Sequence, residues 1–187
     1  KFKSLKKAYA KGTELRGKTL GVIGFGRIGQ ATAKMALGLG MKVLAFDPFL
    51  EKTTLSLAFH DGQTVDFEIK TVSKDTVLKE SDFITLHVPA QKEFVIGKPE
   101  FELMKDGSGL INAARGGVVN EVALVEALNS NKLAFAGLDT FENEPTPAVQ
   151  LLMNPKISLT PHIGAATNQA QDRIGSELAA QIISILK

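Results

Sequence analysis

The segment 24–29, with the sequence Gly-Phe-Gly-Arg-Ile-Gly, constrains the fold of this chain more than any other part of it. An apolar run at 19–23 precedes this segment, and a stretch with helical character follows over 27–39, where Gly40 ends it. A second apolar run then spans 42–46. A strand, a glycine-rich turn, a helix and another strand in this order predict a βαβ unit with two parallel strands.

The spacing of the three glycines is that of a dinucleotide-binding turn. Gly24 permits the tight turn, Gly26 lets a pyrophosphate approach the backbone, and Gly29 allows the helix to pack closely on the strand. The amides at the helix N-terminus then face the phosphates. Arg27 adds a cation at that rim, and Ile28 is a further candidate contact to the cofactor.

Asp47 indicates which dinucleotide is bound. It ends the second strand, near the place where this motif carries an acidic residue, about twenty residues beyond the turn. A carboxylate there accepts hydrogen bonds from the ribose hydroxyls and repels the 2′-phosphate of NADP, and Pro48 stands where an NADP site often has a basic residue. The sequence therefore predicts NAD as the cofactor. A purely structural glycine turn is the alternative, and the flanking strand, helix and acid argue against it.

Short apolar runs alternate with helical stretches along the rest of the chain, as in a parallel α/β sheet. The predicted strands are 19–23, 42–46, 64–70, 83–87, 109–112, 133–138 and 157–159. The predicted helices are 27–39, 73–79, 100–105, 121–128 and 167–187, with Ser73 and Asn120 as two of the caps. Strands this apolar need helices on both faces. We therefore expect an α/β fold with a doubly wound, Rossmann-type parallel sheet.

For two of these helices the sequence predicts which residues form the apolar face. The helix 27–39 is expected to bury Ile28, Ala31, Ala33 and Met35. The last helix is expected to be amphipathic, with an apolar stripe of Ile174, Leu178, Ile182 and Ile185. Residues 48–64 are the least regular part of the chain, and the stretch 59–71, which includes His60, has no assigned role.

Composition and charge restrict the partners of this protein. The net charge of +2 gives no general attraction to nucleic acid or membrane, and the absence of cysteine excludes disulfides, thiolate catalysis and cysteine metal sites. No apolar run approaches the ~18 residues of a membrane span. We expect a cytoplasmic protein without a bound metal.

Basic residues nevertheless crowd the first part of the chain. They are Lys1, Lys3, Lys6, Lys7, Lys11, Arg16 and Lys18. A nucleic-acid-binding arm is one interpretation. A solvated helix face or linker is the favoured one, because no aromatic-rich binding motif accompanies these residues.

Polar residues follow directly after apolar strands in the second half of the chain. The segments concerned are 112–117, 139–145 and 160–167. Because the carboxyl ends of parallel strands share one sheet edge, Arg115, Glu144 and His162 can converge beside the nicotinamide. A histidine can move a proton near neutral pH, a carboxylate can orient it, and an arginine can bind a substrate carboxylate in a fork. Each residue taken alone could instead be an ordinary surface group.

From residues 12–15 to the last helix, the chain resembles the D-isomer-specific 2-hydroxyacid dehydrogenase family. The matching segments are 17–21, 24–29, 86–89, 112–116, 139–145 and 161–164. The resemblance implies hydride transfer between NAD and a small 2-hydroxy or 2-oxo acid. It implies that Arg115 binds the substrate, that Glu144 is the partner of the histidine, and that His162 is the general acid/base.

The resemblance also implies contacts to the cofactor. Asp139 would engage the nicotinamide amide. The other cofactor-lining positions are Val88, Pro89, Ala113, Ala114, Gly164 and Ala165. The family usually has a leucine after the His-x-Pro segment and a threonine four residues later, whereas this chain has Ala90 and Phe94. The family's contacts from this loop therefore do not carry over directly.

Members of this family have a second, substrate-binding domain, which we expect to lie outside these 187 residues. Residues 1–187 would be the NAD-binding domain, with about 1–16 and 167–187 as connections between domains. The fragment alone is expected to bind cofactor with little or no catalysis, and the complete protein is expected to be a homo-oligomer. The segments 12–15 and 17–21 favour 3-phosphoglycerate, in serine biosynthesis, as the substrate. Alternatives are a glyoxylate or hydroxypyruvate reductase and an NAD-sensing, corepressor-like binding protein.

Overall fold

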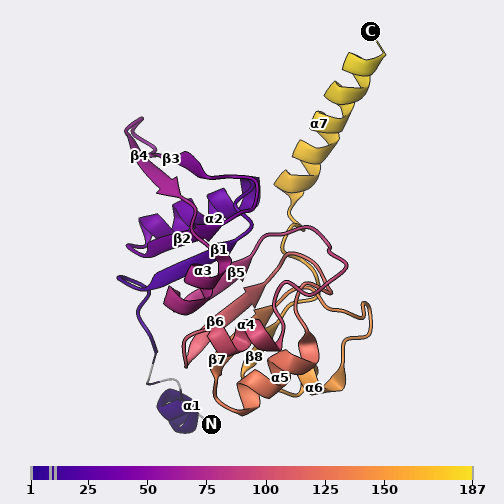
Figure 1. Cartoon of the computed structure of the whole chain (residues 1–187). Coiled ribbons are helices and arrows are strands. Elements are labelled where there is room, and N and C mark those ends of the chain that lie inside the picture. Colours follow the sequence, from indigo (N-terminus) through magenta and orange to yellow (C-terminus); the bar gives the residue numbers. More distant parts are fainter. Residues whose placement is uncertain (1, 9, 11, 187) are drawn as a thin grey trace.

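The computed structural model of the chain describes residues 2–8, 10 and 12–186. Figure 1 shows a central sheet with helices packed around it, while helices α1 and α7 lie apart from the sheet near the two ends of the chain. In chain order the elements are α1 (Phe2–Ala8), β1 (Thr19–Ile23), α2 (Arg27–Gly38), β2 (Lys42–Phe46), β3 (Lys52–Ala58), β4 (Thr64–Lys70), α3 (Lys74–Glu80), β5 (Phe83–Leu86), α4 (Lys98–Leu103), β6 (Ser108–Asn112), α5 (Glu121–Asn129), β7 (Leu133–Leu138), α6 (Val149–Leu152), β8 (Ile157–Leu159) and α7 (Asn168–Ile185).

Six of the strands form one parallel sheet in the order β2-β1-β5-β6-β7-β8. The chain runs from β1 to β2 on one side and then crosses to β5 on the other side, so the strand order changes direction at β1. Ile23, the last residue of β1, pairs with Phe46 of β2 and Leu86 of β5, which aligns the carboxyl ends of these strands. This confirms the predicted doubly wound, Rossmann-type sheet. In such a sheet a ligand binds beyond the carboxyl ends of the strands, where the order reverses.

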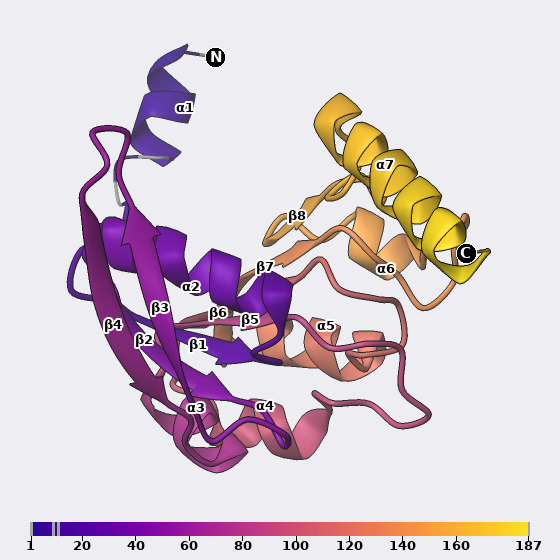
Figure 2. The same ribbon diagram turned by 90° about the horizontal axis from the view of Figure 1, so that it is seen from above.

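Helices cover both faces of the sheet, as predicted. Helix α2 packs against β1 and β2 on one face, and α3 and α5 pack on the other, with α4 beside them (Figure 2). The core is divided accordingly. Val22 and Phe25 pack with Ala33 of α2 in one apolar cluster, and Leu78 of α3 belongs with Leu124 of α5 to the other.

The side of α2 that faces the sheet was predicted wrongly. Of its expected buried positions only Ala33 is buried, and the row that packs on the sheet is Gly29, Ala33 and Ala36. The larger Ile28 and Met35 are 70% and 64% exposed. Small residues bring the helix axis close to the strands, so the close approach that Gly29 permits sets the orientation of the helix.

The caps predicted from the sequence are present. Ser73 Oγ accepts a hydrogen bond from the amide of Thr76 (3.1 Å), and Asn120 Oδ1 accepts one from the amide of Ala123 (2.9 Å). Gly40 follows α2 with a φ of +75°. These residues satisfy backbone groups that the helix ends would otherwise leave unpaired.

The segment after β2 forms a β-hairpin. Strand β4 confirms the strand predicted over 64–70, whereas its antiparallel partner β3 lies in the part expected to be irregular. Leu55 of β3 is fully buried in the cluster beneath α2, which anchors the hairpin to the domain. His60 is exposed at the turn of the hairpin.

The two ends of the chain pack little against the sheet. The predicted amphipathic helix forms as α7, but none of its side chains is buried, including the expected apolar stripe. Of the basic residues of the N-terminal part, Lys3, Lys6 and Lys7 lie in the short helix α1, Arg16 and Lys18 precede β1, and Lys1 and Lys11 lie outside the described residues. Within the described part of the chain, no helix combines the length and the apolar character needed to cross a membrane.

Candidate active site

The glycine turn connects β1 to α2 at the carboxyl edge of the sheet. Gly24 has a φ of +89°, and a Cβ there would collide with the carbonyl oxygen of His87, so this position requires glycine. A Cβ on Gly29 would collide with the carbonyl oxygen of Gly24. Gly26 differs, because its φ of −72° suits any residue and a Cβ there would meet no atom within 4 Å. This open space beside the N-terminus of α2 fits a phosphate group.

Asp47 follows β2 directly, and its carboxylate reaches the glycine turn. One oxygen accepts a hydrogen bond from the amide of Phe25 (2.7 Å), and the other accepts one from the amide of Phe49 (2.9 Å). A carboxylate oxygen can accept about two hydrogen bonds, so each keeps one position for a ribose hydroxyl. Asp47 thus fixes the turn and still offers the acceptors that the ribose of NAD requires.

Arg27 and Ile28 carry the exposed side chains of the turn. The Arg27 guanidinium lies 3.8 Å from the carboxylate of Glu177 on α7, with both side chains largely in solvent. Such a pair stabilises little, so it does not hold Arg27 away from a phosphate. Arg27 and Ile28 border a cavity of about 750 Å³ between the turn and α7, which His87 and Arg173 also line.

Further predicted cofactor-lining residues come to this edge from other strands. Val88 follows β5 and packs next to Gly24, where a Cβ would lie 3.0 Å from its side chain. Ala113 follows β6 and lies near Gly164, which comes after β8. A Cβ added to Gly164 would lie 3.9 Å from the Cβ of Ala113. The other positions of this group are Pro89 and Ala165, which are exposed, and Ala114, which is buried.

The loop that carries Arg115 is organised by the buried Asn112 at the end of β6. The Asn112 side chain donates to the carbonyl of Arg115 (3.0 Å) and accepts from the amide of Ala114 (3.1 Å). The Arg115 guanidinium donates to the carbonyl of Ala114 (2.6 Å) and is exposed. Sequence reasoning did not assign Asn112 a place in the site, although a buried asparagine that ends an apolar strand was a usable signal.

His162 and Glu144 are in direct contact, as predicted. Nδ1 of His162 lies 2.8 Å from one carboxylate oxygen of Glu144, and the other oxygen accepts from the amide of Phe141 (3.0 Å). The hydrogen bond with His162, followed by that of the Phe141 amide, lowers the pKa of Glu144 from its ordinary value. Glu144 is therefore ionised at neutral pH. Because Nδ1 is engaged, Nε2 is the nitrogen that can exchange a proton with a ligand.

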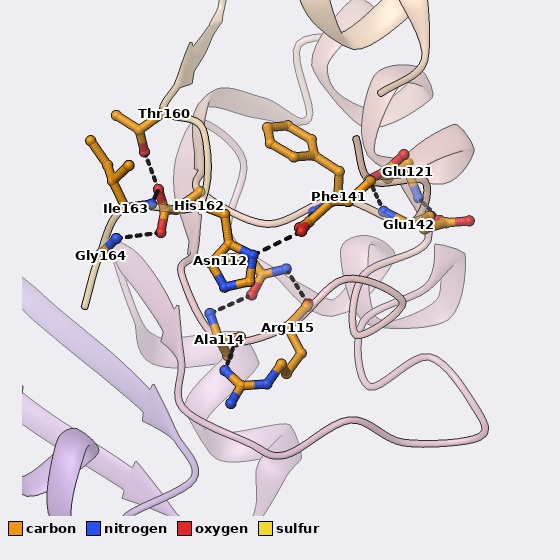
Figure 3. A network of polar contacts seen from close by, with 12 residues as sticks. Asn112, Ala114, Arg115, Glu121, Phe141, Glu142, Thr160, His162, Ile163 and Gly164 are labelled. Atoms are coloured by element: carbon orange, nitrogen blue, oxygen red, sulfur yellow. Dashed lines mark hydrogen bonds and ion pairs between the residues drawn. The ribbon is translucent and has the colours of Figure 1, made fainter. Parts of the chain in front are cut away.

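The three predicted catalytic side chains come from loops after three neighbouring strands, β6, β7 and β8. Figure 3 shows two of them, Arg115 and His162, in the network of polar contacts at this place. The structure brings Glu144 and His162 together in one hydrogen-bonded pair. Within the described residues, the hydrogen bond of the Arg115 side chain is to its own loop, and it makes none to Glu144 or His162. An exposed guanidinium on the loop beside a histidine–carboxylate pair is able to bind an anionic ligand.

Asp139 at the end of β7 holds the loop that carries His162. One carboxylate oxygen accepts from the Thr160 hydroxyl (2.6 Å) and the Ile163 amide (2.8 Å), and the other accepts from the Gly164 amide (2.7 Å). Burial alone would raise the pKa of Asp139, but these hydrogen bonds and the nearby His162 hold that pKa below its ordinary value. One acceptor position remains on the second oxygen, which suits the nicotinamide amide assigned to Asp139 above.

Replacing Asp139 by asparagine is expected to lower the free energy of unfolding by about 1–3 kcal/mol near neutral pH, because the charge-assisted hydrogen bonds of a buried carboxylate are lost. The native pKa is depressed, so this stabilisation is complete above the unfolded value of about 3.9 and disappears as pH falls through the native pKa. Urea denaturation from pH 7 to pH 2.5 measures the effect. Equal stability of the two proteins at pH 7 would contradict this role of Asp139.

A largely apolar cavity of about 340 Å³ adjoins the His162–Glu144 pair. Its other lining residues are Phe141, Pro145, Pro147, Leu152, Leu159, Thr160 and Pro161. Among residues 2–8, 10 and 12–186, no group of three or more His, Cys, Asp or Glu side chains is arranged to hold a metal ion. The site thus combines the glycine turn with a histidine–carboxylate pair and an exposed guanidinium.

The arrangement of these residues agrees with a comparison of the whole sequence. The sequence profile described as "D-isomer specific 2-hydroxyacid dehydrogenase, NAD binding domain" matches residues 2–164. The chain belongs to this family. The match confirms the resemblance inferred from the motifs, and with it the prediction that NAD is the cofactor of the domain.

Individual 2-hydroxyacid dehydrogenases are similar to this chain over part of their length. The D-3-phosphoglycerate dehydrogenase of Archaeoglobus fulgidus is 46% identical over 179 residues, covering 94% of this chain and 32% of that protein. The hydroxypyruvate reductase of Thermotoga maritima is 46% identical over 181 residues, covering 94% and 55%. The structure of D-2-hydroxyisocaproate dehydrogenase matches all of this chain and 58% of its own, with a TM-score of 0.83 and 32% identity. The chain therefore spans only a third to just over half of these relatives.

Proposed function

We propose that this chain is the NAD-binding domain of an oxidoreductase that transfers hydride between NAD and the C2 carbon of a small 2-hydroxy or 2-oxo acid. The observation that carries this proposal is the His162–Glu144 pair, which lies at the same sheet edge as the dinucleotide-binding turn. A dinucleotide site alone would indicate binding. A paired histidine next to it supplies the proton transfer that oxidation of an alcohol requires.

In the proposed reaction His162 acts as the general acid/base. Glu144 holds the ring through Nδ1 and stabilises its protonated form, while Nε2 takes the hydroxyl proton or returns it. Arg115 binds the substrate carboxylate and thereby places C2 against the cofactor. NAD, when bound, supplies the ring carbon that accepts or donates the hydride.

The residues that would hold NAD divide according to the parts of the cofactor. Gly24, Gly26 and Gly29 with Arg27 and Ile28 would form the pyrophosphate site at the N-terminus of α2. Asp47 would bind the adenosine ribose, and Asp139 the nicotinamide amide. The lining of the remaining surface would come from Val88, Pro89, Ala113, Ala114, Gly164 and Ala165. The exposed space at Gly26 and the unused acceptor positions of both aspartates support this assignment.

Replacing Asp47 by alanine is expected to weaken NAD binding about tenfold, since hydrogen bonds to a charged group contribute roughly 1.5–3 kcal/mol each and water replaces part of that. Binding of NADP should weaken less or improve, because the repulsion of its 2′-phosphate disappears. Titration of both dinucleotides by calorimetry gives the ratio of the two affinities. An unchanged ratio would exclude Asp47 from the ribose site.

Within this function we propose 3-phosphoglycerate, the entry to serine biosynthesis, as the substrate. It is supported by the segments 12–15 and 17–21 and by similarity to a D-3-phosphoglycerate dehydrogenase. A hydroxypyruvate or glyoxylate reductase is the second candidate, favoured by the equal identity of the hydroxypyruvate reductase. The proposal includes a substrate domain beyond 1–187, with 1–16 and 167–187 as connections, in a cytoplasmic homo-oligomer.

The proposal is tested by turnover of the full-length protein with NADH. The substrates compared are the 2-oxo acid of 3-phosphoglycerate, hydroxypyruvate and glyoxylate, and preference for the first by kcat/KM supports the assigned substrate. Preference for either of the others favours a reductase. Tight NADH binding without oxidation of any of the three would overturn the enzymatic proposal.

A further inference from the structure

Two glutamates outside the assigned site bind each other's backbone. The amide of Glu121 donates to the carboxylate of Glu142 (2.8 Å), and the amide of Glu142 donates to the carboxylate of Glu121 (2.7 Å). Glu121 is the first residue of α5, and Glu142 lies in the loop that follows β7. Figure 3 shows the pair beside Phe141, at the start of the loop that continues to Glu144.

This pair does more than cap α5, because the return bond from the Glu142 amide to the Glu121 carboxylate satisfies no amide of the helix. Asn120 already caps the helix through the amide of Ala123. Glu121 is only 8% exposed, and burial raises the pKa of its carboxyl group. The hydrogen bond from the Glu142 amide lowers this pKa, whereas the neighbouring charge of Glu142 raises it further. Two adjacent carboxylates are unfavourable in themselves, so their reciprocal bonds indicate that the loop after β7 must be held in one position.

The held loop controls the partner of His162. Glu142 follows Phe141 in the chain and lies two residues before Glu144. The Phe141 amide donates to one oxygen of Glu144, and the other oxygen of Glu144 contacts His162. Gly116 fixes the same place from the other side, since a Cβ there would collide with the carbonyl of Phe141. The loops that carry Arg115 and Glu144 therefore meet at Phe141, and the pair Glu121–Glu142 sets the position of that contact.

We infer that Glu142, together with Glu121, is a positioning residue that holds the Glu144 carboxylate against the imidazole of His162. The inference rests on the proposed function for its catalytic meaning, while the contact itself concerns only this chain. Glu142 acts through Glu144 and does not approach the ligand. Its removal should weaken the coupling of Glu144 to His162 without altering the dinucleotide site around the glycine turn.

The coupling is measured by the tautomer of the His162 ring, followed by ¹⁵N NMR of the 187-residue chain at about pH 9, where an imidazole is neutral. The Glu144 carboxylate accepts a hydrogen bond only from the tautomer that carries its proton on Nδ1. Glu144→Ala should therefore lower the fraction of this tautomer about twofold. Glu142→Ala should produce at least half of that loss.

Two further variants separate positioning from general damage. Glu142→Gln keeps an oxygen that accepts from the Glu121 amide and should restore the tautomer fraction of the unmodified chain. Asn143→Ala alters an exposed side chain of the same loop and should change nothing. Titration of the half-buried ring of His87, which directly follows β5, reports whether each variant is folded, because burial lowers its pKa only in the folded chain.

A tautomer fraction for Glu142→Ala equal to that of the unmodified chain, beside a lowered fraction for Glu144→Ala, overturns the inference. A fraction that Glu142→Gln fails to restore also overturns it, because the acceptor oxygen would then not be the relevant group. NAD titration of the same samples tests the proposed function separately. A chain that shows the expected tautomer fractions but binds no NAD contradicts the function and leaves the positioning role supported.

Discussion

Replacing Gly26 by alanine is expected to weaken NAD binding by this chain about 10- to 100-fold, or ~1.4–2.8 kcal/mol, with no loss of stability. The backbone at Gly26 has a φ of −72°, which alanine adopts without strain, and the added Cβ would meet no protein atom within 4 Å. The methyl group would instead occupy the space in which the pyrophosphate approaches the amides of α2. Calorimetric titration with NAD and thermal denaturation of the same sample measure the two quantities.

Two other glycines of the same helix provide the comparison. Gly38→Ala makes the same change at the far end of α2, also in open space, and should leave NAD affinity unchanged. Gly29→Ala should lower both stability and affinity, because its Cβ would collide with the backbone of Gly24. If Gly26→Ala bound NAD as tightly as the unmodified chain, the pyrophosphate could not lie where we place it.

The parts of the fold that sequence could predict are those fixed by local chemistry. The turn requires glycine at Gly24 because the backbone there has a positive φ. It requires glycine at Gly29 because a Cβ would collide with the carbonyl oxygen of Gly24, five residues earlier. Both requirements act within one βαβ unit. Ser73 and Asn120 cap helices through amides three residues ahead. The contact between Glu144 and His162 is not local. Parallel strands bring their carboxyl ends to one edge, so the topology predicted that these residues converge, and the family resemblance implied that they pair.

The parts that sequence missed depend on packing between distant segments. The orientation of α2 was wrong because apolar size suggested Ile28 and Met35 as core, whereas close packing on the sheet selected smaller residues. Strand β3 was missed because only Leu55 of its alternating side chains is fully buried, and that burial comes from α2 and not from the hairpin itself. The bond from Thr160 to the Asp139 carboxylate likewise joins residues from two strands.

Replacing His162 by asparagine is expected to reduce kcat of the full-length protein about 10²- to 10⁴-fold, the usual contribution of a general acid/base. NAD affinity should be retained, because the glycine turn and Asp47 do not contact this side chain. Asparagine is the suitable replacement, since His162 has a φ of +54° and asparagine tolerates this left-handed conformation better than alanine. The backbone bonds from Ile163 and Gly164 to Asp139 should then survive.

Oxidation of NADH with the preferred 2-oxo acid measures the loss, and fluorescence titration with NADH measures the retained binding. His60→Asn makes the same change at an exposed hairpin turn and should leave both quantities unaltered. A large loss of NADH affinity in His162→Asn would mean that this residue holds the cofactor and does not move the proton. Retained turnover would place the general base elsewhere, and the His162–Glu144 pair would then be a structural link between the loops after β7 and β8. Full NADH affinity with lost turnover is the combination expected when His162 transfers the proton and does not hold the cofactor.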